Sequence, residues 1–286
     1  WRSGIMGGMI ELAPASKTGL AIASPLILGS GAVGWGTAWP AGLEAGWFGA
    51  WVTPPLTLQG RRGTAGPRLA EIPGGFILST GDHNPGLRRV LRDDLLQWEG
   101  LRMPIIVALS AAAPEDWPRL GERLENAGIS AVEAHLPAAA TPRDASGWIA
   151  ALARNCQLPV LVKVSATNAA SLSEACAAAG ADVLVVATPH RAAAAAPDGS
   201  LVEGPVAGPA AFPFTLRALL AVAGLGLGLP LIAAGGITLA EDVAACWQHG
   251  ATAVQLRSIL WTAPGSVRDL AGQWAHRTMP TANASA

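Results

Sequence analysis

The chain has 286 residues and a net charge of −1, with 51% hydrophobic and 14% charged residues. This composition supplies one large core, and it carries no charge excess that would favour nucleic acid or an anionic membrane surface as a partner. Glycine, proline or a charge interrupts every apolar run before the roughly 18 residues that a membrane helix needs. Cys156, Cys176 and Cys246 fit neither a disulfide framework nor a metal site, so we expect a reducing, cytoplasmic setting.

Short apolar runs alternate along the chain with segments of helical periodicity. Residues 9–12 and 20–23 flank a turn, and we expect them to form a short hairpin. Eight buried strands are predicted at residues 26–29, 51–53, 105–109, 131–136, 160–164, 183–187, 231–234 and 253–256. Helices are predicted at residues 84–98, 117–127, 145–155, 171–179, 214–223 and 239–249, and residues 54–80 and 188–213 are predicted to be insertions.

One sequence pattern occurs three times. A helix is predicted to end on glycine, at Gly128, Gly180 and Gly250, and an apolar strand begins two or three residues later. Units of strand, helix and strand form right-handed parallel crossovers. They predict an α/β fold, a single (β/α)8 TIM barrel with an N-terminal hairpin and insertions at the barrel mouth. We expect one domain over residues 1–276 and a disordered tail over residues 277–286.

In the last unit, residues 231–258, the residues that end the strand and start the helix are the clearest. An apolar strand ends at Gly235 and Gly236, where the backbone can turn tightly and approach a ligand. Thr238 is predicted to cap the next helix, with Glu241 completing a capping box. Because ligands bind at the C-terminal ends of barrel strands, ligand approach is favoured over simple turn formation for the two glycines.

Several motifs along the chain carry a family resemblance. They are SPLILGSG at residues 24–31, GTAGPR at 63–68, GGFILSTGDHNPG at 74–86, LVKV at 161–164, GPVAGP at 204–209, GGI at 235–237 and GATAVQ at 250–255. In order and spacing they resemble the class 1 dihydroorotate dehydrogenases, which are FMN-dependent (β/α)8 barrels, over almost the whole chain.

The resemblance implies a flavin site without a metal. Lys163 stands where the family places a lysine against the flavin ring, although the alternative is a lysine that fills the barrel interior against Glu133. The phosphate would meet the backbone amides of Gly235 and Gly236, and also Arg257 and Ser258, which stand where the family has glycine and Thr or Ser. FMN is thus the implied cofactor, either retained or lost.

The departures from the family concern the substrate. Ala138 occupies the slot of the catalytic base, and a methyl group cannot accept a proton. Pro54 stands where the family has a substrate-contacting lysine. Leu78, His135 and Ala187 stand where it has asparagines. His135 is a weak candidate for a substitute base, and a packed or solvent-bonded histidine is the favoured alternative.

Two functions follow from this combination. The favoured one is a pseudoenzyme, catalytically silent toward dihydroorotate, that acts as a structural or regulatory subunit. The other is an FMN-dependent oxidoreductase with a rebuilt substrate pocket. Because the family typically dimerises, we expect a homodimer or a heteromer with a related barrel subunit.

Overall fold

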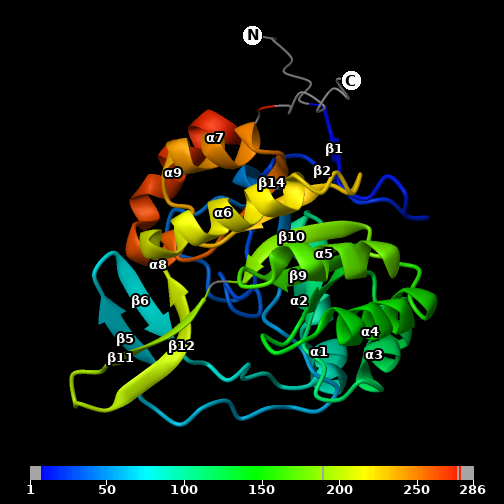
Figure 1. The fold of residues 1–286 in the computed structure, drawn as a ribbon, viewed down its shortest axis with the longest axis horizontal. Helices are drawn as coiled ribbons and strands as arrows, with labels where there is room; N and C mark the ends of the chain where they lie inside the picture. Colours follow the sequence, from blue (N-terminus) through cyan, green and yellow to red (C-terminus); the bar gives the residue numbers. More distant parts are fainter. Residues whose placement is uncertain (1–7, 189, 276, 278–286) are drawn as a thin grey trace.

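The computed structural model describes residues 8–188, 190–275 and 277. Eight parallel strands close into a barrel in the order β10-β13-β14-β3-β4-β7-β8-β9 (Figure 1). Their bounds are β3 Leu26–Leu28, β4 Ala50–Val52, β7 Ile105–Leu109, β8 Ala131–His135, β9 Val160–Ser165, β10 Val183–Thr188, β13 Leu231–Ala234 and β14 Ala251–Leu256. The prediction of a single closed (β/α)8 barrel is therefore confirmed. Of the predicted tail, residues 278–286 lie outside the described part of the chain.

Helices surround the barrel, as the sequence pattern predicts. They are α1 Leu87–Asp93, α2 Leu95–Trp98, α3 Asp116–Leu124, α4 Pro142–Arg154, α5 Ala169–Ala178, α6 Phe212–Ala223, α7 Ala240–Gln248, α8 Ile259–Thr262 and α9 Pro264–Trp274, with short 3-10 turns at Ala45–Trp47, Glu99–Leu101 and Pro209–Ala211. The sequence analysis missed α8 and α9. Within the described residues, no helix is long and apolar enough to cross a membrane.

The core has two parts on either side of the strands. Small and β-branched side chains such as Ala108, Val185 and Ala253 fill the barrel interior. Larger side chains lie between the strands and the helices, where Trp51 packs edge-on against Trp98 with ring centroids 5.3 Å apart. This two-sided burial explains why the strands are continuous apolar runs rather than alternating ones.

Two helices differ from the prediction at their N-terminal ends, and local side-chain hydrogen bonds explain both differences. Asp242, rather than Glu241, caps α7, because its carboxylate accepts from the backbone amides of Thr238 and Leu239, each at 2.9 Å. The predicted helix over residues 84–98 begins only at α1, since the side chain of Asn84 accepts from the amide of Gly86 and holds a turn there.

The two predicted insertions form one structure. Residues 54–80 contain β5 (Leu69–Ile72) and β6 (Gly75–Leu78), and residues 188–213 contain β11 (Arg191–Ala195) and β12 (Leu201–Ala207). Antiparallel pairing of β12 with β6 joins them into a sheet of order β11-β12-β6-β5 at lower left in Figure 1. Both insertions follow the C-terminal ends of barrel strands, so the sheet stands at the mouth. The predicted N-terminal hairpin is confirmed as β1 (Ile10–Glu11) with β2 (Ala21–Ile22).

The joint between the insertions can be tested at Gly75. A Cβ there would lie 2.0 Å from the carbonyl oxygen of Ala207 on β12, so we expect Gly75→Ala to lower the free energy of unfolding. Overpacking of this kind costs roughly 1–3 kcal/mol. Urea denaturation measures the loss. The control is Gly147→Ala in α4, where a Cβ would meet no atom within 4 Å. Equal losses in both variants would contradict the close approach of the two strands.

Candidate functional site

Alternation along the strands decides which side chains enter the barrel mouth. Each barrel strand sends every second residue inward, and the interior cluster fixes the parity. At the C-terminal ends, the inward positions two residues beyond the last interior apolar residue include Gly29, Pro54, Ser110 and Gly236, and those four residues beyond it on β8, β9 and β14 are His135, Ser165 and Arg257. Five of these residues are small, so His135 and Arg257 are the two long side chains among them.

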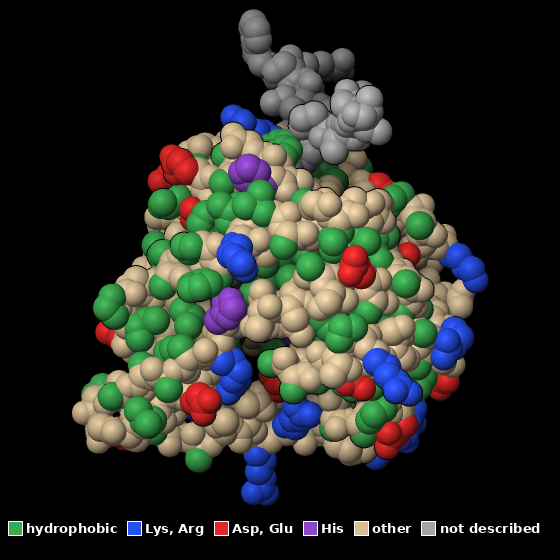
Figure 2. All heavy atoms as spheres, viewed as in Figure 1, with side chains coloured by type: hydrophobic (Ala, Val, Ile, Leu, Met, Phe, Trp, Pro, Cys, Tyr) green, Lys and Arg blue, Asp and Glu red, His purple; other side chains and the backbone are tan. Residues whose placement is uncertain are grey.

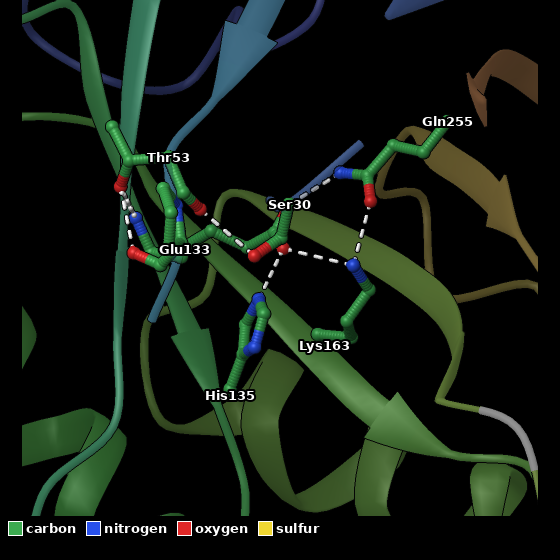
Figure 3. A network of polar contacts seen from close by, with 8 residues as sticks. Ser30, Thr53, Glu133, His135, Lys163 and Gln255 are labelled. Carbon is green, nitrogen blue, oxygen red and sulfur yellow. Dashed lines mark hydrogen bonds and ion pairs between the residues drawn. The ribbon is translucent and has the colours of Figure 1, made fainter. Parts of the chain in front are cut away.

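Deeper in the barrel than His135, a network of polar side chains crosses the interior (Figure 3). Glu133 on β8 is fully buried. Its carboxylate accepts from Lys163 Nζ at 3.1 Å, contacts His135 Nε2 at 2.6 Å, and accepts from the amide of Gln255. Lys163 also donates to Gln255 Oε1 at 2.6 Å. The buried charge of Glu133 is therefore matched by a cation and two further hydrogen bonds.

The network shifts the pKa of two of its members. Burial by itself would raise the pKa of the Glu133 carboxyl, but Lys163 and the hydrogen bonds from His135 and Gln255 outweigh burial and lower that pKa to about 2. Burial lowers the pKa of His135 below its ordinary value; the Glu133 hydrogen bond opposes this change, and the Lys163 charge adds to it. At neutral pH the carboxylate is therefore ionised and the imidazole is neutral.

Gly235 and Gly236 follow β13 in a turn that favours glycine. Both have positive φ, 120° and 72°, and a Cβ on Gly236 would lie 2.3 Å from the backbone nitrogen of Phe212. Neither amide donates a hydrogen bond to an acceptor among the described residues. Free amides beside a glycine-only turn suit an anionic group such as a phosphate.

Arg257 lies beside these glycines, on the neighbouring strand end. Its guanidinium stacks on Trp261, with 5.1 Å from Cζ to the ring centroid, and its Nε is buried without a hydrogen-bond partner in the described part of the chain. Burial lowers the pKa of Arg257, while Asp82 opposes this shift. An anion at this place would satisfy the guanidinium. Ser258 follows as a buried residue at the start of α8.

These observations test whether the residues fit FMN. At the phosphate end they do, because the amides of Gly235 and Gly236 have no acceptor among the described residues, and Arg257, at the end of the neighbouring strand, has a buried Nε without a partner there. At the ring end, Lys163 is present at the predicted strand end, but its amine already binds Glu133 and Gln255. The ion pair of Lys163 with Glu133 in the barrel interior is therefore observed, whereas its role beside a flavin ring stays a prediction.

The substrate positions lie where the sequence places them, on elements around the mouth. Ala138 is exposed on the loop after β8, Ala187 is buried in β10 and Leu78 is half-buried at the end of β6. None of the three side chains can donate or accept a hydrogen bond. Cysteines offer no replacement base, since burial raises the pKa of Cys176 and of Cys246 to about 12.

The sequence analysis missed two contributors. Gln255 was noted only as part of a strand, although its parity in β14 points it inward to Lys163. Asp82 entered the sequence analysis only as part of the motif at residues 74–86, but it accepts from Ser110 Oγ at 3.1 Å and pairs with Arg61 at 3.4 Å. Strand parity was a usable signal for Gln255. No local signal pointed to the contacts of Asp82.

On the outer surface, unlike in the mouth, the charged side chains are scattered (Figure 2). The face drawn in Figure 2 is hollowed near its centre, between the four-stranded sheet and helices α3 and α4. Side chains of both charge signs are scattered over this face, without a large patch of one sign.

The buried carboxylate predicts an acid-dependent loss of stability. Folding lowers the pKa of Glu133 from 4.5 to about 2, so its stabilising effect is complete above about 4.5 and is lost as the pH falls toward 2. Glu133→Gln should remove this dependence and, by leaving Lys163 unpaired, cost roughly 3–5 kcal/mol. Urea denaturation across this pH range measures both effects. The exposed Glu71→Gln on β5 is the control, and an unchanged pH dependence in Glu133→Gln would show that another group is responsible.

Comparison with known proteins identifies the family. The profile of the family described as dihydroorotate dehydrogenase matches residues 15–275. A protein of Desulforudis audaxviator named dihydroorotate dehydrogenase B (NAD(+)), catalytic subunit, is 32% identical over 274 residues, which cover 88% of each chain. Proteins of the same name from Geobacter sp. strain M21 and Geobacillus kaustophilus are 28% and 29% identical, over 88% of each chain for the first, and 82% of this chain and 81% of the relative for the second. The chain therefore belongs to the dihydroorotate dehydrogenase family.

Proposed function

We propose that this member of the family does not oxidise dihydroorotate. The observation that carries the proposal is Ala138, an exposed methyl group in the slot where the family resemblance places the catalytic base. Leu78 and Ala187 add to it, because they offer no hydrogen bond to a polar ring. Loss of a general base costs about 10²–10⁴ in rate, and each unmatched polar group costs roughly 1–3 kcal/mol.

The mouth geometry favours an FMN-dependent oxidoreductase with a rebuilt substrate pocket. Gly235, Gly236 and Arg257 supply donors for the cofactor phosphate, and Lys163 supplies a fixed cation near the ring. When bound, FMN would provide the acceptor for hydride transfer. Two of these features, the glycine-only turn and the buried Nε of Arg257 without a partner in the described part of the chain, are costly to keep in a barrel that binds nothing at this place.

The second candidate is the function that the sequence favours, a catalytically silent structural or regulatory subunit. It is supported by the simultaneous departures at Pro54, Leu78, Ala138 and Ala187. The relatives are named catalytic subunits, so they belong to assemblies of more than one chain. We therefore also propose that this chain forms a homodimer or a heteromer with a related barrel subunit, and that it acts in the cytoplasm. Flavin absorbance of the purified protein distinguishes the two candidates, since a silent barrel without FMN is colourless.

Dihydroorotate itself provides the main test. Protein incubated with FMN is mixed with excess dihydroorotate without oxygen, and flavin absorbance is followed. We expect no bleaching on the time scale of enzyme turnover, because no side chain at residue 138 accepts the proton. The Desulforudis audaxviator relative is the positive control. Bleaching at a comparable rate would overturn the proposal.

Arg257 tests the cofactor site. If its guanidinium pairs with the FMN phosphate, Arg257→Ala should weaken FMN binding by roughly 10- to 100-fold, the value of a charged hydrogen bond of about 1.5–3 kcal/mol. Fluorescence quenching of FMN measures the dissociation constant, and the exposed Arg143→Ala on α4 is the control. Tighter binding in Arg257→Ala would mean instead that the arginine fills the phosphate site.

A further inference from the structure

His135 stands at a position where an imidazole can meet a ligand. It is the last residue of β8 and points inward at the mouth, two residues beyond Glu133. Its side chain is 19% exposed. At the ends of the flanking strands β7 and β9, the inward positions are the small residues Ser110 and Ser165.

The contact with Glu133 decides which ring nitrogen carries the proton. Glu133 is an ionised carboxylate at neutral pH and can only accept hydrogen bonds. The 2.6 Å contact with His135 Nε2 must therefore be an N–H donated by the ring (Figure 3). In a neutral imidazole, the lone pair then lies on Nδ1, and Nδ1 has no hydrogen-bond partner among the described residues.

The charged groups around the ring keep it neutral without making it inert. Glu133 faces it from its own strand, Lys163 from β9 and Asp82 from the loop after β6. Glu133 and Asp82 favour the protonated ring, whereas burial and Lys163 oppose it. Once Nδ1 has taken a proton, the imidazolium remains hydrogen-bonded to the carboxylate, which stabilises it. This is the arrangement of an oriented general base.

We propose that His135 is a proton acceptor of the barrel mouth: its Nδ1 removes a proton from a bound ligand, while Glu133 holds the ring through Nε2. Residue 138 plays no part in this step. The ligand loses a proton to Nδ1 and keeps the electron pair, so the step itself needs no oxidant.

The charges of the mouth indicate the class of ligand. Lys163 is paired with Glu133, and Arg61 with Asp82, so Arg257 is the one cation described at the inner strand ends that has no carboxylate within 4 Å. This step rests on the proposed function, in which Arg257 binds the cofactor phosphate; no other unpaired cation is then left for a second anion at the inner strand ends that the structure describes. The ligand is therefore a small neutral molecule with a weakly acidic proton.

A neutral probe tests the base without flavin or dihydroorotate. In 5-nitrobenzisoxazole a base removes the C3 proton, the C–H electron pair forms the nitrile, and the N–O bond breaks to give a coloured phenolate. We expect wild-type protein to accelerate this reaction, His135→Ala to lose roughly 10²–10⁴ of the rate, and Glu133→Gln to lose rate while retaining the histidine. The rate should rise with pH to a plateau, with a midpoint below the ordinary histidine value of 6.5.

The control and a second measurement complete the test. His249→Ala, at the exposed end of α7, should leave the rate unchanged. Nitrogen NMR of wild-type protein labelled at histidine should show His135 protonated at Nε2, and this measurement needs no variant to fold. A rate no greater than that of free imidazole, or a ring protonated at Nδ1, overturns the inference. The bleaching assay with dihydroorotate tests the proposed function separately.

Discussion

The buried charge of Glu133 is the constraint on which the interior of this barrel depends. A carboxylate without access to water costs several kcal/mol unless partners replace its hydration. Those partners are Lys163 on β9 and Gln255 on β14, three steps apart in the strand order β9-β10-β13-β14. They can meet one carboxylate only when the sheet has closed. Closure of the barrel and compensation of the charge are therefore coupled.

The same carboxylate shapes the chemistry at the mouth. It fixes the orientation of His135, and it binds the amine of Lys163 that the family resemblance assigns to the flavin ring. A flavin placed above the network would share that lysine with Glu133, so the positive charge that it experiences is partly compensated. The residues of the mouth are thus neither purely structural nor purely functional. Any substitution at Glu133 changes the stability of the barrel and the protonation of its mouth together.

Much of the fold could be predicted from the sequence, because its signals are local. Apolar runs fixed the eight strands to within about two residues, and the glycines at Gly128, Gly180 and Gly250 marked the helix ends. Long-range contacts could not be predicted. The pairing of β6 with β12 joins segments more than a hundred residues apart, and nothing in either segment specifies its partner. The site divides in the same way. Lys163, Gly235 and Gly236 followed from motifs, whereas the contacts of Asp82 depend on how loops meet in space.

Charge balance at the mouth links these observations to the choice of ligand. A barrel that holds both a cofactor phosphate and the carboxylate of dihydroorotate must offset two negative charges at close quarters. Here the ion pairs Lys163–Glu133 and Arg61–Asp82 are each neutral, so among the described residues at the inner strand ends only Arg257 is a cation left to receive an anion. Pro54, in the place of the family's substrate-contacting lysine, removes the second cation. A carboxylate entering this mouth beside a bound phosphate would find no further unpaired cation at the inner strand ends that the structure describes. This charge balance supports the proposal that the chain does not oxidise dihydroorotate, and it does so by an argument separate from Ala138.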